Sequence, residues 1–213
     1  MLADRRRGLV AGAGFIAAAA ATMFLVGRHP AAAAPLSSFG PVGHLDARAA
    51  SLGRELDVGP VHPVALTLNA LGYGIVVAFV WFAAAAMLVL RRAWDRFAVV
   101  VLTWLGSELS IQPLKDVWHR GRPPDPDFSI GGFAMPSGHA IRGSAVTLAL
   151  VFAFVPPGRG RRPWLMGAGA FATLMGLSRI VLGVHWLSDV VAGSTLGAGI
   201  ALLAASIASP RRR

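Results

Sequence analysis

The chain has 213 residues, of which 55% are hydrophobic and only 14% are charged, and its formal net charge at pH 7 is +10. Its mean hydropathy of +0.61 is too high for an ordinary soluble domain, so the composition indicates an integral membrane protein. The positive charge does not indicate a nucleic-acid partner, because the arginines flank apolar runs instead of lying among aromatic residues on a polar surface.

Six segments reach or approach the ~20 apolar residues that a helix needs to cross a bilayer. In chain order they cover approximately residues 8–26, 64–90, 97–113, 139–155, 164–182 and 187–209. The third and fourth segments are short. The sequence therefore predicts an all-α fold, an integral membrane six-helix bundle that forms a single domain over residues 1–213.

The first of these segments has an alternative interpretation as a cleavable signal peptide. Arg5, Arg6 and Arg7 precede it, and alanines from Ala31 to Ala34 follow it. Its apolar stretch is longer than the usual core of a signal peptide, which favours a membrane span. Cleavage would leave five spans without moving any later loop.

The stretch between the first two spans carries a short helical pattern. Leu45, Ala49, Leu52 and Leu56 recur at the spacing of one helix face. This spacing predicts a short helix at the outer membrane interface. A plain connecting loop is the alternative.

Four arginine clusters predict the orientation. If the N-terminus is cytoplasmic, six spans place every cluster on the cytoplasmic side, where short basic loops are retained. We therefore expect a multi-pass protein of the plasma membrane with both termini in the cytoplasm. The clusters hold twelve of the twenty basic residues, namely Arg5, Arg6, Arg7, Arg91, Arg92, Arg96, Arg159, Arg161, Arg162, Arg211, Arg212 and Arg213.

Two features concern how the helices pack. Gly193 and Gly197 form a small-xxx-small pair in the last span, which predicts a close approach to a neighbouring helix. The chain has no visible internal repeat, and this disfavours a transporter built from inverted repeats.

Polar side chains are costly at membrane depth, so those beside the spans are candidates for function. Three groups of them follow or open a span, and the expected topology places all three on the outer side. The groups are Lys115 with Arg122-Pro123 and the nearby Arg120; Pro136-Ser137-Gly138-His139; and Ser178-Arg179 with His185 and Asp189.

The cations of these groups predict an anion site. Lys115, Arg122 and Arg179 would repel one another at the membrane boundary without a partner that offers several oxygens. Ser137 and Gly138 open a helix, where unpaired N–H groups and the helix dipole favour phosphate. The anion is therefore expected to be a phosphate.

The histidines supply a nucleophile and an acid. His185 and Asp189 are four residues apart, so they stack on one helix face, and the carboxylate can accept the Nδ1 hydrogen of the imidazole. Nε2 of His185 is then free to attack phosphorus, and His139 can protonate the departing oxygen.

No metal site and no cofactor are expected. The chain lacks cysteine, its sequence shows no closely spaced set of His, Asp and Glu ligands, and the nearby cations would repel a metal ion. Among the remaining histidines, His29, His44 and His62 are interpreted as loop residues. The spacing gives no role to His119 or Arg120.

The three groups together resemble the motifs of the type 2 phosphatidic acid phosphatase superfamily, also called lipid phosphate phosphatases. The motifs are Lys, six residues, Arg-Pro; Pro-Ser-Gly-His; and Ser-Arg, five residues, His, three residues, Asp. All three are complete between Lys115 and Asp189. The superfamily also contains soluble acid phosphatases and vanadate-dependent haloperoxidases, which the predicted spans disfavour.

The resemblance implies a helical bundle with its site at the outer membrane interface and a phosphohistidine intermediate on His185. It implies that Asp189 orients His185 and that His139 is the general acid. It further implies that the phosphoryl oxygens are held by Lys115, Arg122, Ser137, Gly138 and Arg179.

The expected partners are a lipid substrate and the surrounding membrane lipids. Polyprenyl diphosphate, phosphatidylglycerol phosphate and phosphatidic acid all fit, and an outward-facing site favours the first. A lipid phosphotransferase with the same site and a lipid transporter without hydrolysis are the alternatives. The sequence does not predict the oligomeric state.

Two charged residues lie inside the predicted spans. Glu108 comes seven residues before Lys115 on the third span, and Arg142 follows His139 by three residues on the fourth. We expect Glu108 and Arg142 to pair across the helices beneath the site, since a charge inside a span needs a partner. Separate hydrogen bonds in a wet cleft are the alternative. The loop from Pro124 to Met135 is interpreted as a lid or as a passive connector.

Overall fold

The computed structural model describes residues 2–27 and 40–208, and within these ranges the chain forms helices joined by turns and loops, without a strand. The predicted all-α class is confirmed. The elements are α1 (Leu2–Val26), α2 (Gly40–Leu56), α3 (Val61–Leu71), α4 (Gly74–Leu90), α5 (Trp94–Trp118), α6 (Gly138–Phe154), the short 3₁₀ helix η2 (Arg159–Arg161), α7 (Arg162–Val181) and α8 (Leu187–Ala208).

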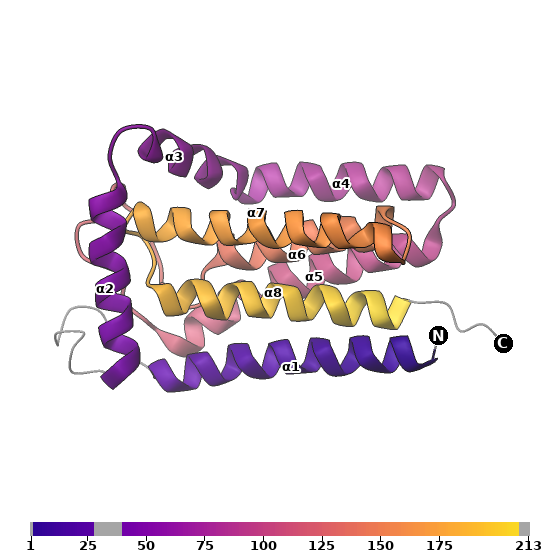
Figure 1. Cartoon of the computed structure of the whole chain (residues 1–213), viewed down its shortest axis with the longest axis horizontal. Helices are drawn as coiled ribbons and strands as arrows, with labels where there is room; N and C mark the ends of the chain where they lie inside the picture. Colours follow the sequence, from indigo (N-terminus) through magenta and orange to yellow (C-terminus); the bar gives the residue numbers. More distant parts are fainter. Residues whose placement is uncertain (1, 28–39, 209–213) are drawn as a thin grey trace.

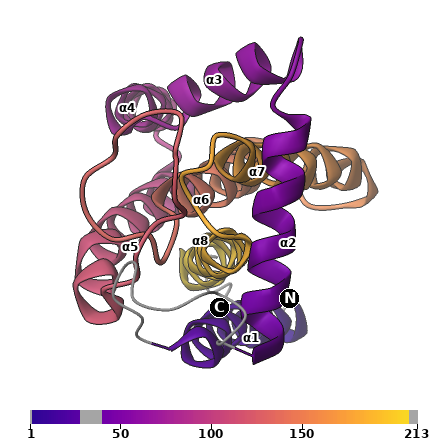
Figure 2. The ribbon, with the colours of Figure 1, turned by 90° about the vertical axis from the view of Figure 1, so that its left-hand side faces the viewer.

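The long helices run side by side, and α2 crosses one end of the bundle (Figure 1). Helix α8 packs against α1, α5 and α6, while α7 packs on α6 and α4 packs on α5. Figure 2 looks onto the end that α2 crosses and shows α8 among the other helices. The last helix of the chain is therefore the central element of the bundle.

Four elements of the described chain are long and apolar enough to cross a membrane: α1, α5, the continuous stretch of η2 and α7, and α8. The bent pair of α3 and α4 is a fifth candidate, whereas α6 has only 17 residues. Large apolar side chains on the outside of the bundle, such as Phe24 at 75% and Leu90 at 85% exposure, suit a lipid environment. A multi-pass helical bundle is confirmed, and the count of six spans stays a prediction.

The second predicted span is broken. Helix α3 ends at Leu71 and α4 begins at Gly74, with a bend of 55° between them. At the break, Gly72 lies against the ring of His139, and a Cβ on Gly72 would collide with that ring. The prediction of one continuous helix was wrong here, because both halves are apolar and hydropathy carries no signal of the bend.

The predicted close helix approach is confirmed between α6 and α8. A Cβ on Gly193 would lie 2.6 Å from the carbonyl oxygen of Ser137, well inside the 3.0 Å that real Cβ atoms essentially never cross. Gly197 lies equally tightly against the backbone at Ile141. The absence of side chains at these two positions lets the start of α6 lie directly on α8.

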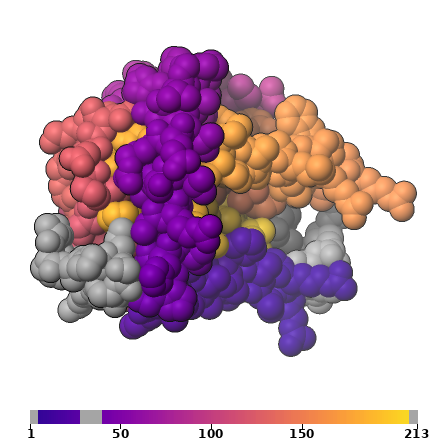
Figure 3. Space-filling model, turned by 60° about the vertical axis from the view of Figure 1, so that its left-hand side comes forward, coloured from indigo at the N-terminus to yellow at the C-terminus, as the bar shows by residue number. Residues whose placement is uncertain are grey.

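Helix α2 confirms the predicted helix between the first two spans. Its buried residues include Asp46 and Gly53, and Gly53 lies against the backbone of Ile180 in α7. Leu45 and Leu52, from the predicted apolar face, are exposed. Figure 3 shows α2 lying on the surface across the end of the bundle. The apolar face points away from the protein, as expected for a helix whose lipid-facing side meets the interface.

The described arginine clusters gather at the end of the bundle opposite α2. The start of α1, the α4–α5 turn and the start of α7 all lie there (Figure 1). Their shared placement agrees with one cytoplasmic face, although the membrane orientation itself stays a prediction. His29, the alanines Ala31 to Ala34 and the cluster Arg211 to Arg213 lie outside the described residues.

Candidate active site

The helix ends that carry the three motif groups lie at the end of the bundle that α2 crosses (Figure 2). Lys115 is in the last turn of α5, and Arg179 is in the last turn of α7. The second group opens α6, His185 lies in the α7–α8 connection, and Asp189 is in the first turn of α8. Residues from four helices and two loops are thus brought to one place.

His185 is held in one orientation by its two neighbours. Its Nδ1 lies 3.4 Å from Oδ2 of Asp189, and its Nε2 lies 3.3 Å from Nη1 of Arg122. Because a guanidinium can only donate, Nε2 must present its lone pair to Arg122, and the proton therefore resides on Nδ1. This is the tautomer that the sequence spacing predicts, with the lone pair of Nε2 directed at a cation.

The His185 ring is 3% exposed, and its pKa reflects this burial. Loss of hydration lowers the pKa of His185 to about 4; the Asp189 carboxylate opposes this shift, and the charges of Lys115 and Arg122 add to it. The imidazole is therefore neutral at physiological pH, which is the form that can act as a nucleophile.

Lys115 and Arg122 are anchored by backbone carbonyls. Arg122 donates from Nη1 to the carbonyl of Val184 at 2.8 Å and from Nε to the carbonyl of Gly132 at 3.2 Å. The ammonium of Lys115 donates to the carbonyl of Phe133, which also accepts from Arg122. Burial lowers the pKa of Arg122, while Asp189 opposes the shift. Among the residues that the structure describes, no carboxylate is bound directly to either cation.

Arg179 is fully buried and incompletely bonded. Its Nη1 donates to the side-chain oxygen of Asn69 in α3, but Nε and Nη2 have no hydrogen-bond partner in the described structure. The hydroxyl of Ser137 is also buried without a partner. A buried donor without an acceptor costs about 1–3 kcal/mol, and more when it is charged. These atoms are arranged to bind a ligand rich in oxygen.

A backbone hydrogen bond joins Ser137 to α8. Its amide donates to the carbonyl of Asp189 at 3.0 Å, and Ser137 precedes the first residue of α6, Gly138. The helix start that the sequence predicts as a phosphate cradle is therefore attached directly to the segment that carries His185 and Asp189.

His139 lies in a different contact from the expected one. Its Nε2 is 3.1 Å from the backbone carbonyl of Asn69, so this nitrogen carries a proton and donates it to α3. The ring packs edge-on against Tyr73 with centroids 5.9 Å apart. His139 faces the α3–α4 break here, and Asn69 links it to Arg179.

Arg120, which received no role from its spacing, is an important part of the site. Its Nη1 donates to Oδ1 of Asp189 at 2.5 Å and to Oγ of Ser188 at 2.7 Å, and its Nη2 donates to Oδ2 of Asp46 at 2.6 Å. Asp46 also accepts from the backbone N–H of Ser188 at 2.8 Å. One buried guanidinium therefore connects α2 to the carboxylate that orients His185.

Sequence reasoning missed both Asp46 and Asn69. Both are nearly fully buried, at 1% and 5% exposure, and both lie on helices outside the motifs. The one available signal for Asp46 was a carboxylate on the inner face of a short amphipathic helix, where a buried charge needs a partner.

The predicted pair beneath the site is confirmed. Arg142 donates from Nε to Oε1 of Glu108 at 2.8 Å and from Nη2 to Oε2 at 2.7 Å, which is a two-pronged ion pair between α5 and α6. Gly74, the first residue of α4, is close to the same guanidinium: a Cβ at this position would lie 3.5 Å from Nη2 of Arg142. The pair therefore sits where α4, α5 and α6 meet.

The loop from Pro124 to Met135 packs on the protein. The amide of Asp127 donates to the carbonyl of Leu182 at 3.3 Å, and the ring of Phe128 lies 5.8 Å from the guanidinium carbon of Arg179. Phe128 and Ile130 also pack on a small apolar cluster that includes Ala65 of α3. The loop thus covers the Arg179 side of the site.

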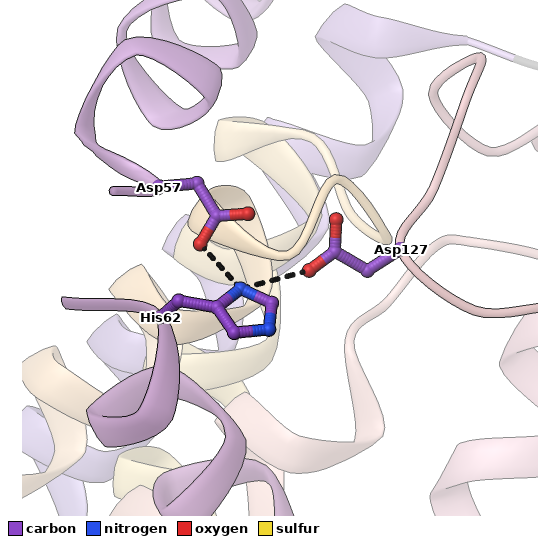
Figure 4. A group of neighbouring side chains, drawn as sticks. All are labelled: Asp57, His62 and Asp127. Carbon is purple, nitrogen blue, oxygen red and sulfur yellow. Dashed lines mark hydrogen bonds and ion pairs between the residues drawn. The ribbon is translucent and has the colours of Figure 1, made fainter. Parts of the chain in front are cut away.

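Two histidines assigned to loops lie in helices. His44 is in α2, and His62 is in the first turn of α3. Within the described ranges, one group of three His, Asp or Glu side chains is placed to hold a metal ion, and it consists of Asp57, His62 and Asp127 (Figure 4). The expectation of no ligand set was based on spacing along the sequence. Asp127 is distant in sequence from Asp57 and His62, and only the fold brings the three together.

The fold and the motif cluster are those of an integral membrane protein of the PAP2 class, and comparison with known proteins agrees. The family model described as "PAP2 superfamily" matches residues 96–213, more than half of the chain. The chain belongs to this superfamily.

Individual relatives are moderately similar. Phosphatidylglycerophosphatase B of Bacillus subtilis is 29% identical over 53% of this chain, and the matched part spans 58% of that protein. Undecaprenyl-diphosphatase of Sulfolobus acidocaldarius is 39% identical over 36% of this chain and 34% of its own length. Decaprenylphosphoryl-5-phosphoribose phosphatase of Mycobacterium tuberculosis is 31% identical over 47% of this chain and 54% of its own length. The similarity thus extends over about half of these relatives or less.

Two solved structures share the fold. The crystal structure of a transmembrane PAP2 type phosphatidylglycerolphosphate phosphatase from Bacillus subtilis matches with a TM-score of 0.68 at 24% identity, over 79% of this chain and 88% of that one. The crystal structure of Aquifex aeolicus LpxE matches with a TM-score of 0.59 at 20% identity, over 75% of this chain and 94% of that one. These similarities support the helical architecture over the matched three quarters or more of this chain.

Proposed function

We propose that this protein is a membrane lipid phosphatase that hydrolyses a lipid phosphate or diphosphate at the outer membrane face, with His185 as the nucleophile. The observation that carries the proposal is the set of buried donors without acceptors, Nε and Nη2 of Arg179 and Oγ of Ser137, beside a neutral His185. A phosphoryl group offers the oxygens that these donors lack. Relatives named as phosphatases of lipid phosphates support the same reaction.

The first step forms a phosphohistidine. Nε2 of His185 attacks phosphorus while the bond from phosphorus to the lipid oxygen breaks, and the imidazolium form of His139 gives that oxygen a proton. Arg122, now bonded to Nε2, turns to the phosphoryl oxygens, and Lys115 and Arg179 share the negative charge that spreads over them. The proton on Nδ1 of His185 stays bonded to Asp189 and stabilises the positive ring.

The second step consumes water. Neutral His139 removes a proton from a water molecule, whose oxygen bonds to phosphorus as the bond from Nε2 to phosphorus breaks. Phosphate leaves, and His185 and His139 return to their starting states. In both steps His139 must turn away from the carbonyl of Asn69, which its Nε2 contacts in this structure.

The substrate is proposed among three lipid classes. Polyprenyl diphosphates, phosphatidylglycerol phosphate and phosphatidic acid all present a terminal phosphoryl group next to an apolar chain. An outward-facing site favours polyprenyl diphosphates, whose head groups are released on that side. The exposed apolar surface of the bundle fits any of these chains.

A panel assay tests the proposal. Purified protein in detergent is given each lipid phosphate and diphosphate, and released phosphate is measured for the wild type, for His185→Ala and for His44→Ala, an exposed histidine on α2. We expect release that persists with a chelator, is inhibited by vanadate, falls at least about a thousandfold in His185→Ala and is unchanged in His44→Ala. No release from any lipid, or full release by His185→Ala, would contradict the proposal.

The same assay separates the alternatives. A phosphotransferase would pass the phosphoryl group to an added lipid acceptor, which product analysis detects. A transporter would move lipid across liposomes without releasing phosphate.

A further inference from the structure

Three side chains from separate segments converge next to the α2–α3 turn. Asp57 lies between α2 and α3, His62 lies in the first turn of α3, and Asp127 lies in the loop between α5 and α6 (Figure 4). Nδ1 of His62 is 2.8 Å from Oδ1 of Asp57 and 3.5 Å from Oδ2 of Asp127, and the three ligand atoms all lie within 4.8 Å of one another. None of the three belongs to the motifs or contacts His185 directly.

We propose that Asp57, His62 and Asp127 form a binding site for a divalent transition-metal ion such as Zn²⁺. The donor set of one imidazole nitrogen and two carboxylate oxygens is typical of this ion class. Bonds of about 2.0–2.1 Å in a tetrahedral site place ligand atoms roughly 3.3 Å apart. The observed separations of 2.8 and 3.5 Å lie on either side of that value.

The charges of the group independently favour a cation. In the described chain His62 is the ion-pair partner of both carboxylates, and neither pairs with a lysine or an arginine. Protonated His62 would offset one of the two negative charges, whereas a divalent ion offsets both.

The ion would fasten the loop from Pro124 to Met135 to α3. The backbone amide of Asp127 donates to the carbonyl of Leu182, at the start of the connection that carries His185. The next residue, Phe128, places its ring against the guanidinium of Arg179. Metal binding therefore holds the loop on the Arg179 side of the site. This role is structural, so the metal takes no part in the phosphoryl transfer, and the chelator result expected above is unaffected.

Metal binding is tested on the whole chain in detergent, without a histidine tag, after chelator treatment and its removal. Zn²⁺ uptake at equilibrium is measured by elemental analysis for the wild type, His62→Ala and Asp127→Asn. The matched controls are His44→Ala and Asp125→Asn, which change an exposed histidine and an exposed aspartate outside the group. We expect one ion per chain in the wild type and both controls, and binding weakened tenfold or more in the other two variants, in line with losses of 10–100-fold from weaker metal-site changes.

Hydrogen exchange locates the ion without any variant. We expect Zn²⁺ to slow exchange of the wild type in peptides that contain residues 57–62 and 124–130. Protection that maps elsewhere, no uptake by the wild type, or equal uptake by His62→Ala and the wild type would overturn the proposal. Phosphate release is measured in parallel, so loss of the metal site alone does not count against the phosphatase.

Discussion

Arg120 connects two carboxylates that the chain places on different helices. Its guanidinium bonds to Asp46 on α2 and to Asp189 on α8, and the three side chains are almost fully buried. Two buried carboxylates and one guanidinium leave one negative charge, which the positive ring formed on His185 can offset during the reaction. The geometry gives Asp46 a role in positioning Asp189 through Arg120, without contact with the substrate.

Replacing Asp46 tests this role. We expect Asp46→Ala to destabilise the protein by about 3–5 kcal/mol, because removing one partner leaves the Arg120 charge incompletely paired in a buried place. The loss of positioning should lower kcat more than it raises KM. Thermal unfolding in detergent and steady-state kinetics measure both effects, with Arg48→Ala on the exposed face of α2 as the control. An unchanged kcat in folded Asp46→Ala would show that Asp46 does not act through Asp189.

The pH dependence of the reaction follows from the state of His185. Burial lowers the pKa of His185 to about 4, so the ring stays neutral and nucleophilic above that pH and is lost as a nucleophile when the pH falls through it. We expect kcat/KM to fall on the acidic side near pH 4 because of the enzyme. An unperturbed histidine, with a pKa of 6.5, would place this fall near pH 6.5. The substrate phosphate also ionises in this range, so the profile is measured with substrates of different phosphate pKa. The fall that stays at the same pH for all of them belongs to the enzyme. Such a fall at pH 6–7 would contradict the assigned environment.

At the scale of helices, the ion pair between Glu108 and Arg142 joins α5 to α6 below the site. We expect Glu108→Arg and Arg142→Glu each to reduce folded yield and activity, because each brings two like charges together at a partly buried position. The double variant should recover part of both, with a coupling energy of about 0.5–3 kcal/mol. Yield of monodisperse protein and phosphate release measure the recovery. A double variant no better than either single change would remove the pair from the account.

Sequence reasoning predicted most of the elements but missed one bend. The apolar runs locate α1, α5, α7 and α8, since length and hydropathy are read directly from the chain. The break at Gly72 was missed because both halves are apolar, and because the ring that lies against Gly72 belongs to His139, a residue that is distant in sequence. Three residues before Gly72, Asn69 contacts both His139 and Arg179.

The candidate site shows the same division. The motif spacing predicted the contact between His185 and Asp189, and the cost of intramembrane charge predicted the pairing of Glu108 with Arg142. Arg120 escaped assignment, because its carboxylate partners lie on α2 and α8 and only the fold brings them together. Sequence spacing shows partners a few residues apart, and the cost of a charge inside a span points to the Glu108–Arg142 pair, whereas neither signal reveals the partners of Arg120.

The proposed orientation requires the two ends of the molecule to differ chemically. The arginine clusters of the described chain lie at one end and the motif residues at the other (Figure 1). The chain has no cysteine, so single cysteines can be introduced without background. We expect Ser129→Cys to react with an impermeant thiol reagent added outside intact cells and Gly160→Cys to react only after permeabilisation. The reverse pattern would place the site in the cytoplasm.

The phosphoenzyme provides the most direct test of the central claim. Wild-type protein is mixed briefly with a lipid substrate carrying a labelled terminal phosphate, quenched in alkali and digested, and the labelled peptide is sequenced by mass spectrometry. We expect an acid-labile, alkali-stable phosphate on His185 that is absent from His185→Ala. Rapid phosphate release without any label on His185, or a label on another residue, would contradict the claim.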